Sequence, residues 1–378
     1  MNDARDEIRA RINLEDLVSE YVELKRAGRN FKALSPWTNE RTPSFVVSPD
    51  KQIWHDFSSG KGGDIFGFIM EVEGMSVREA LEFLARKAGV ELKNYDSKQS
   101  AENAKRRKRL YGALSAAVHF YQHSLIRDKN ALNYVFKDRK MSKEIVTEFQ
   151  IGYALTGRQT LTDYLIKKGF SRQEINAAGL LNRFGGDIFN GRMMIPLQDP
   201  SGSTIGFTGR ILNDEPNSPK YLNTPQTMLY DKSRHVFGLS QAKQSIRKNN
   251  FVVVVEGNMD VIASHQDDVK NVVATAGTAM TSQHLKSISR YTNDIRLCFD
   301  ADAAGVNATE RAIVLAQTVG ADISIISLDQ SAGAAKDPDE LIQKDVKLWQ
   351  KSIANPRAAV DWVLDQYETR LDIKTATG

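Results

Sequence analysis

The sequence predicts an α/β protein, in which an α+β N-terminal segment precedes a mixed α/β segment and a parallel sheet. Three observations support this class. Strand-like and helix-like stretches alternate from residue 246 onward, which is typical of a parallel sheet with right-handed crossovers. Short aromatic runs separated by turn residues predict small antiparallel strands within the first 92 residues. Between these parts, residues 110–240 begin with helical stretches and then become mixed.

The composition is that of an ordinary globular protein. Of the 378 residues, 26% are charged and 41% hydrophobic, and the net charge of +4 weakly favours a polyanionic partner. No apolar run is long enough to span a bilayer and the N-terminus lacks a signal-peptide core, which predicts a cytoplasmic protein without membrane contact. Cys298 is the single cysteine, which excludes an intrachain disulfide and a cysteine-rich zinc site.

The N-terminal segment, to about Leu92, is expected to combine helices with short strands. Glu15–Leu24 carries apolar residues at helical spacing, and Asp64 and Ser76 stand where N-caps are expected before two further helices. Strands are expected at Phe31–Leu34, Ser44–Ser48 and Gln52–Phe57.

A polar stretch without periodicity, Lys93–Ala104, is expected to be a linker. It leads into Lys105–Arg109, five consecutive cations that are expected to open a helix. They are either a solvated helix end or a patch that contacts phosphates. Further along, Arg192–Gln198 and Thr204–Phe207 are expected to be strands joined by a turn.

The third segment shows the most regular alternation of expected strands and helices. The unbroken apolar run Phe251–Val255 indicates a strand that is covered on both faces. The other expected strands are Asn271–Thr275, Asp294–Phe299 and Asp322–Leu328, and the expected helices are Asn258–His265, Ser282–Ser289 and Asn307–Val319.

Six carboxylates follow the carboxyl ends of these strands, where open α/β sheets place their ligands. They are Glu256, Asp260, Asp300, Asp302, Asp337 and Asp339. Any one of them alone is more readily a helix cap or a loop residue, but together they are expected to converge on one crevice. Their mutual repulsion requires cations, and carboxylate oxygens suit hard divalent ions, Mg²⁺ above all and Mn²⁺ as an alternative. Paired Mg²⁺ ions can activate a 3′-hydroxyl and stabilise a leaving pyrophosphate.

Four motifs of the third segment stand out: Glu256–Asp260, Ala276–Ala279, Phe299–Gly305 and Lys336–Asp339. Together they resemble the TOPRIM domain of DnaG-type primases. The resemblance implies that the six acids form a metal site for nucleotidyl transfer, with Glu256, Asp300 and Asp302 as its catalytic group. Three positions depart from the family's usual tyrosine, glycine and acid without removing a metal carboxylate: Asn258, Ala301 and Lys336.

TOPRIM domains also occur in topoisomerases, nucleases and recombination mediators, so the second segment decides between these classes. Five of its stretches resemble the polymerase core of primases: Arg192–Leu197, Gly206–Arg210, Pro219–Thr224, Asp231–Arg234 and Phe237–Leu239. The resemblance implies a basic ridge that handles template and incoming nucleotides, although any single member could be an ordinary surface cation. The expected nucleotide- or template-binding residues are Arg192, Arg210, Lys220, Tyr221, Asn223, Lys232 and Arg234.

The N-terminal segment resembles the family's zinc ribbon at Arg29–Leu34, Thr42–Phe45 and Gly62–Phe66. The positions of the ribbon's Cys and His ligands hold Ser35, Thr38, Asp56 and Ser59, so no zinc is expected. Either hydrogen bonds among these polar residues hold the ribbon or aromatic packing does. Packing is favoured over a stacking platform for bases at Phe31, Trp37, Phe45, Trp54 and Phe57.

The resemblance implies a DNA primase, a DNA-directed RNA polymerase that makes RNA primers on single-stranded DNA from ribonucleoside triphosphates. A strand-cleaving TOPRIM enzyme would need a catalytic tyrosine domain, and an inactive DNA-binding adaptor should lack acids that are all present. A monomer is expected, with a replicative helicase as partner through a C-terminal region absent here, so the chain is expected to be part of a longer one. The expected domains are a degenerate ribbon at 1–96, the N-terminal part of the polymerase core at 105–240, TOPRIM at 241–345 and the start of a helical subdomain at 346–378.

Overall fold

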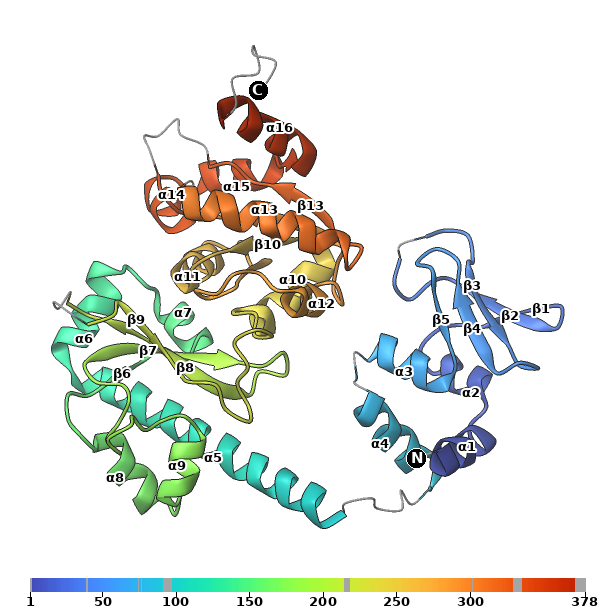
Figure 1. Ribbon diagram of the computed structural model, residues 1–378, viewed down its shortest axis with the longest axis horizontal. Coiled ribbons are helices and arrows are strands. Elements are labelled where there is room, and N and C mark those ends of the chain that lie inside the picture. The colour runs from blue at the N-terminus through green and yellow to red at the C-terminus, as the bar shows by residue number, and fades with distance from the viewer. Residues whose placement is uncertain are drawn as a thin grey trace. The chain divides into compact units, whose positions relative to one another are not determined.

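A computed structural model of the chain describes residues 2–38, 40–73, 75, 77–90, 97–213, 218–300, 302–328 and 335–370. It forms two compact units, residues 1–100 and 101–378 (Figure 1). Both units mix helices and strands, which confirms the predicted class. Within the described residues, no helix is long and apolar enough to cross a membrane. The expected subdivision of the second unit remains a prediction.

The first unit is a five-stranded antiparallel meander with helices on one face. Its strands pair in chain order, and alternation along β3 turns Phe45 and Val47 inward and Val46 and Ser48 outward. The elements are α1 (Asn2–Arg11), α2 (Leu14–Ser19), β1 (Lys25–Ala27), β2 (Asn30–Ala33), β3 (Phe45–Ser48), β4 (Ile53–Asp56), β5 (Lys61–Gly63), α3 (Ile65–Val72) and α4 (Val77–Ala88).

The three expected strands of this unit are confirmed as β2, β3 and β4, and Asp64 caps α3 by accepting the N–H groups of Phe66 and Gly67. The expected cap at Ser76 lies outside the described residues. The helix expected over Glu15–Leu24 ends at Ser19 instead. Beyond it Tyr21 packs edge-on against Phe68 and donates its hydroxyl to Glu73 at 2.8 Å.

The expected linker is largely helical, which is a correction. Helix α5 (Ser97–Arg127) begins inside Lys93–Ala104, so the cations Lys105–Arg109 lie within the helix rather than at its start. Residues 97–104 contain Ala, Glu, Gln and Lys, all good helix formers, but no apolar stripe. The lack of an apolar periodicity predicted a linker, whereas the helix propensity of these residues favours the helix that the structure shows. Positions 93–96 lie outside the described residues.

In the second unit, the later turns of α5 pack against an antiparallel sheet of order β6-β7-β8-β9 (Figure 1). The expected strand Arg192–Gln198 is confirmed as β7, and the one expected at Thr204–Phe207 extends to Ile211. The elements are α6 (Lys129–Asn133), the π-helix η1 (Tyr134–Asp138), α7 (Lys143–Glu148), β6 (Gly152–Ala154), α8 (Thr160–Lys167), α9 (Arg172–Ala177), β7, β8 (Thr204–Ile211), β9 (Tyr221–Asn223) and α10 (Leu239–Asn249).

A second sheet, of order β11-β10-β12-β13-β14, completes this unit. Its first four strands are parallel, as predicted, and the four valines of β10 are fully buried. The short antiparallel strand β14 was not expected. The elements are β10 (Val252–Val255), α11 (Asn258–Gln266), β11 (Val272–Ala274), α12 (Ser282–Ile288), β12 (Asp294–Cys298), α13 (Ala303–Gln317), β13 (Asp322–Ile325), α14 (Pro338–Lys344), α15 (Val346–Ala354), β14 (Arg357–Ala358) and α16 (Ala359–Arg370).

The two sheets of the second unit share a hydrophobic core. Phe237 and Ala274 exchange backbone hydrogen bonds of 2.8 and 3.0 Å, which joins the chain after the antiparallel sheet to β11. Met193 and Ile195 of β7 belong to the same buried cluster as Val253 of β10. This shared core holds the acids of one sheet in a fixed relation to the cations of the other.

Candidate active site

The carboxyl ends of β10 and β12 bring two of the predicted acids into contact. These strands are parallel neighbours, with Val255 opposite Cys298. Glu256 follows β10, and its carboxylate accepts the backbone N–H of Asp300 at 3.1 Å. The strand ends therefore meet at one edge of the sheet, as the sequence predicts.

Asp260 connects this edge to α14. It lies in the first turn of α11, where one carboxylate oxygen accepts the N–H of Gly257 at 3.1 Å. The other oxygen accepts the N–H of Asp339, also at 3.1 Å. Asp337 is the N-cap of α14 and accepts the N–H of Glu340 at 2.8 Å.

Asp302 is the N-cap of α13 and accepts the N–H of Gly305 at 2.8 Å. Gly305 is tightly constrained, because a Cβ at this position would stand 2.0 Å from the carbonyl oxygen of Asp300. Only glycine therefore permits this turn. Three of the acids accept hydrogen bonds from backbone amides at helix starts: Asp302, Asp337 and Asp260. The alternative that an acid here serves as a helix cap therefore describes part of their role.

Electrostatics joins all six acids into one cluster. Burial, followed by the charges of Asp337 and Asp339, raises the pKa of Asp260 to about 8. Burial raises the pKa of Asp300 to about 6, with further contributions from Glu256, Asp337 and Asp302. Burial also raises the pKa of Asp339 and of Asp337. Four carboxyl groups thus resist ionisation side by side, and their oxygen atoms are the donors that a hard divalent cation prefers.

No three His, Cys, Asp or Glu side chains within the described ranges form a ready-made metal-binding group. The fit to a cation therefore rests on the oxygen donors and on their mutual repulsion. Cys298, buried beneath the strand ends, experiences the same charges: burial raises its pKa well above the usual value, and four of the acids add to the shift.

Arg210 extends from β8 toward these acids and is held by two phenols. Its Nε donates to the hydroxyl of Tyr134 at 2.8 Å, and its Nη1 donates to the hydroxyl of Tyr221. Burial raises the pKa of Tyr221 to about 12, so this phenol stays neutral. Arg210 itself is only 7% exposed, and its charge partly opposes the rise in the pKa of Asp339 that burial causes.

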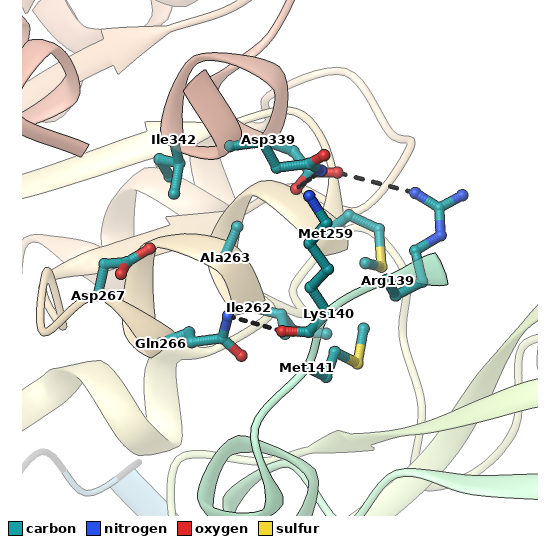
Figure 2. A pocket seen from close by; sticks show the side chains of 11 residues that line it. Arg139, Lys140, Met141, Met259, Ile262, Ala263, Gln266, Asp267, Asp339 and Ile342 are labelled. Carbon is teal, nitrogen blue, oxygen red and sulfur yellow. Dashed lines mark hydrogen bonds and ion pairs between the residues drawn. The ribbon is translucent and has the colours of Figure 1, made fainter. Parts of the chain in front are cut away.

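A second arginine, Arg139, shares the Tyr134 hydroxyl and was not predicted. Its Nε donates to Tyr134 at 3.1 Å, while its Nη1 lies 3.9 Å from a carboxylate oxygen of Asp339 (Figure 2). Tyr134 begins the π-helix η1, and such helices are rare and frequent at functional sites. Nothing in the local sequence marks a π-helix, so the sequence offered no signal for this pair.

The backbone that carries Arg139 is fixed beside a small cavity of about 190 Å³ (Figure 2). Lys140, the next residue, has a left-handed φ of 52°. Gln266 of α11 holds it there by donating to the Lys140 carbonyl at 3.2 Å and accepting the N–H of Ser142 at 2.8 Å. Helix α11 thus positions Arg139 as well as Asp260.

Arg192 is placed differently from the other predicted cations. It is 5% exposed, and its guanidinium donates to the carbonyls of Pro219 at 2.8 Å and of Gly209 at 3.2 Å. These bonds support the segment that presents Lys220. In this conformation Arg192 bonds these carbonyls and, at 3.2 Å, the Ser218 hydroxyl, and its role in binding remains a prediction.

The remaining predicted cations are exposed. Lys220 lies near the acids, because it opposes the rise in the pKa of Asp337 that burial causes. Asn223 is half-buried at the end of β9. Lys232 and Arg234 stand on a turn that is anchored to α12: His284 pairs with the Lys232 carbonyl at 3.1 Å. The structure thus brings Arg210, Tyr221 and Lys220 to the acids, and places Lys232 and Arg234 over α12.

In the first unit, the predicted zinc-ligand positions converge on a buried carboxylate. Asp56 is fully buried and accepts the hydroxyls of Ser35 at 2.8 Å and Ser59 at 2.5 Å. Thr38 reaches it indirectly, through a 2.8 Å bond to Ser58, which in turn donates to Asp56 at 3.0 Å. We call Asp56 with Ser35, Ser44, Ser58 and Ser59 the Asp56 hub.

Aromatic packing supports the same sheet. Trp54 is buried and stacks against both Trp37 and Phe45, with ring centroids 5.0 and 5.5 Å away, and those two rings lie 5.8 Å from each other. Phe31 is half-buried and packs against this core. Packing is thus confirmed for these four aromatic residues, whereas Phe57 is 70% exposed. The two alternatives for holding the ribbon, hydrogen bonds and packing, operate together.

Three family models match successive parts of the chain. Residues 1–100 match a family model described as a CHC2 zinc finger, residues 120–243 match the DNA primase catalytic core N-terminal domain, and residues 253–342 match a Toprim-like model. The last match implies that the chain uses a divalent metal.

The similar proteins are DNA primases. The chain is 38% identical to the DNA primase of Enterococcus faecalis over 356 residues, 90% of this chain and 56% of that protein. It is 36% identical to that of Synechocystis over 391 residues, 98% and 61% of the two chains. It thus spans a little over half the length of the curated relatives it matches.

Solved structures give the same result. The crystal structure of the zinc-binding and RNA polymerase domains of Aquifex aeolicus primase aligns with a TM-score of 0.63 and 31% identity, covering 97% of this chain and 88% of that one. A DnaG primase catalytic domain bound to single-stranded DNA aligns with a TM-score of 0.65, also at 31% identity, over 73% and 87% of the two chains. With all three family models matched in order along the sequence, this chain belongs to the DnaG-type primase family.

Proposed function

We propose that this protein is a DNA primase, which synthesises short RNA primers from ribonucleoside triphosphates on single-stranded DNA in the cytoplasm. The observation that carries the proposal is that a cluster of carboxylates and a pair of arginines meet within the second unit. Six carboxylates gather at the ends of β10 and β12 and the starts of α11, α13 and α14, and the arginines around Tyr134 approach them, with Arg139 3.9 Å from Asp339.

Glu256, Asp260, Asp300, Asp302, Asp337 and Asp339 would hold the metal, for which we propose Mg²⁺, with Mn²⁺ as a substitute. When bound, such ions neutralise the triphosphate and stabilise charge at the reacting phosphorus. Glu256, Asp300 and Asp302, at the strand ends, are the proposed catalytic group.

The cations have a complementary task. Arg210 and Arg139 are fixed by the Tyr134 hydroxyl and so present their charge with little loss of conformational entropy. We assign them, with Tyr221 and Lys220, to the phosphates of the incoming nucleotide. Asn223, Lys232 and Arg234 are assigned to template or nucleotide, and Arg192 supports the loop of Lys220 from within.

The direct test is ribonucleotide incorporation on a single-stranded DNA template without a primer, with Mg²⁺ or Mn²⁺. Product that depends on template and metal is expected. Cleavage of the DNA strand instead would support the TOPRIM topoisomerase or nuclease alternative. Tight DNA binding without synthesis in either metal would support an inactive adaptor. We further propose that the protein is a monomer and that a replicative helicase is its partner.

We also propose that the first unit folds without zinc, because the Asp56 hub occupies the place of the ligands and forms its own hydrogen bonds. Elemental analysis should find no stoichiometric zinc, and a chelator should leave the circular dichroism of the chain unchanged. About one zinc per chain, lost on chelation together with N-terminal structure, would overturn this.

A further inference from the structure

A rigid turn between α9 and β7 displays an exposed phenylalanine. Phe184 is 71% exposed. The turn below it is closed by Asn182, whose N–H donates to the Gly186 carbonyl at 2.8 Å and whose side-chain oxygen accepts the N–H groups of Phe184 and Gly186 at 2.9 and 3.2 Å. Gly185 adopts the left-handed φ of 74° that the turn requires. The aromatic ring is therefore held out by a preorganised backbone.

Three arginines from three segments surround this turn. The guanidinium of Arg183 lies 4.7 Å from the centre of the Phe184 ring. Arg172, from the first turn of α9, donates to the Gly185 carbonyl at 2.5 Å. Arg158 accepts the N–H of Asp187 on its own carbonyl at 2.8 Å. All three side chains are exposed, and none forms an ion pair with a carboxylate among the described residues.

The acids of the same stretch of chain leave this positive charge uncompensated. Between residues 157 and 191 the chain has three carboxylates. Asp187 is 2% exposed and accepts the N–H groups of Leu161 and Thr162, and Glu174 is paired with Arg109 at 2.6 Å. Only Asp163 is exposed and without such a partner in this stretch. The surface around Phe184 is thus suited to a polyanion.

We propose that this turn is a binding site for single-stranded nucleic acid, in which an unpaired base stacks on Phe184 while Arg183, Arg172 and Arg158 contact the flanking phosphates. Aromatic rings among cations bind single strands in this way, because every base has a face that can stack. A preorganised turn makes this contact without first losing conformational freedom.

The site is separate from the acids. Helices α8 and α9 lie at the end of the second unit that is away from α11 and α14 (Figure 1). None of the four residues that carry the proposal is among those assigned to the reaction. The inference rests on the proposed function only in taking the single strand to be template at some distance from the reacting end.

The test is the affinity of the full chain for a fluorescent oligo(dT), measured with Phe184→Ala, Phe184→Trp and Arg183→Ala. Phe184→Ala should weaken binding roughly tenfold, whereas Phe184→Trp should bind at least as well as the parent. The new tryptophan should also be quenched when the oligonucleotide binds. Arg183→Ala should lower the slope of log affinity against log salt by about one.

The matched control is Ile126→Ala, which removes an apolar side chain that is also 71% exposed, on α5. It should bind oligo(dT) like the parent. Parental affinity in Phe184→Ala, or no quenching in Phe184→Trp, would overturn the inference and leave the proposed function intact. If the parent itself bound no single-stranded DNA, both would fail.

Discussion

The buried carboxylate of Asp260 accepts the backbone N–H of Asp339, at 3.1 Å, across 79 positions of sequence. This bond attaches the start of α14 to α11, and so holds two further acids beside a group that already resists ionisation. Burial and the charges of Asp337 and Asp339 raise the pKa of Asp260 to about 8. The fold thus concentrates acidic groups, and the amide hydrogen bonds of Gly257 and Asp339 oppose only part of the rise in the pKa of Asp260.

Asp302→Asn should reduce nucleotide incorporation by roughly a hundredfold or more, with the affinity for single-stranded DNA largely kept. Asparagine caps helices as well as aspartate, so α13 should keep its cap at Gly305 while the site loses one charge. Incorporation and DNA binding are measured on the same preparation.

The control for this variant is Asp345→Asn, which changes the N-cap of α15 in the same way, where the cap accepts the N–H of Lys347 at 2.9 Å. It should incorporate like the parent. Near-normal synthesis by a folded Asp302→Asn protein would remove Asp302 from the proposed metal site.

Tyr134→Phe should raise the nucleotide KM or lower kcat, by about tenfold in kcat/KM, because Arg139 and Arg210 lose the hydroxyl that fixes them both. Affinity for single-stranded DNA should change little. A positioning role predicts this separation, whereas a purely structural role would appear as a lower melting temperature with unchanged kcat/KM.

Tyr121→Phe is the matched control, since the Tyr121 hydroxyl is buried without a hydrogen-bond partner among the described residues. Removing it should leave activity unchanged and cost no stability. Equal effects of the two substitutions on kcat/KM would show that the Tyr134 hydroxyl has no special role.

Asp56→Asn should destabilise the first unit by about 2 kcal/mol at neutral pH, because a buried anion that accepts several hydroxyls is replaced by a neutral amide. Burial alone would raise the pKa of Asp56, but the hydrogen bonds from Ser59, Ser35, Ser44 and Ser58 outweigh it and lower the pKa below the usual 3.8. The unfolded chain therefore binds this proton more readily than the folded one.

The contribution of Asp56 should thus be complete well above pH 3.8 and should disappear as the pH falls through the lower folded-state pKa. Denaturant unfolding of parent and variant measures this, and the two free energies of unfolding should converge in acid. The control is Asp50→Asn, which alters an exposed carboxylate of the same unit. A difference between parent and Asp56→Asn that does not depend on pH would contradict the hub.

Lys220→Ala and Lys232→Ala should affect different steps. We expect Lys232→Ala mainly to raise the nucleotide KM or lower kcat, and Lys220→Ala to do this and also to weaken DNA binding equally across sequences. The salt slope of DNA binding should then fall by about one unit. Lys347→Ala, on the exposed surface of α15, is the control. Parental behaviour of both variants in both assays would make these lysines ordinary surface cations.

The sequence predicted those parts of the site that depend on strand ends. Apolar runs located β10 and β12, and parallel pairing then placed Glu256 beside Asp300. Interactions that depend on tertiary context could not be predicted from the sequence. The burial of Arg192 follows from carbonyls 17 to 28 positions away, and the joint contact of Arg139 and Arg210 with Tyr134 follows from a π-helix.

The ribbon illustrates the same limit. The residues at the ligand positions predicted that no zinc is bound, but not that one carboxylate would accept hydrogen bonds from four serine hydroxyls there. That arrangement depends on the register of β3 and β4, which sets Asp56 opposite Phe45 on the inner face. Register was not determined by the sequence pattern of such short strands.

The Asp56 hub also changes the chemistry to which the first unit is vulnerable. A ribbon held by thiolates loses its ligands when oxidants convert them to disulfides or sulfinic acids. Here the single cysteine, Cys298, lies buried in the other unit, and the hub consists of hydroxyls and a carboxylate that such oxidants do not attack. Peroxide stress therefore has no thiol to attack in the first unit, and strong acid is the condition that weakens the hub.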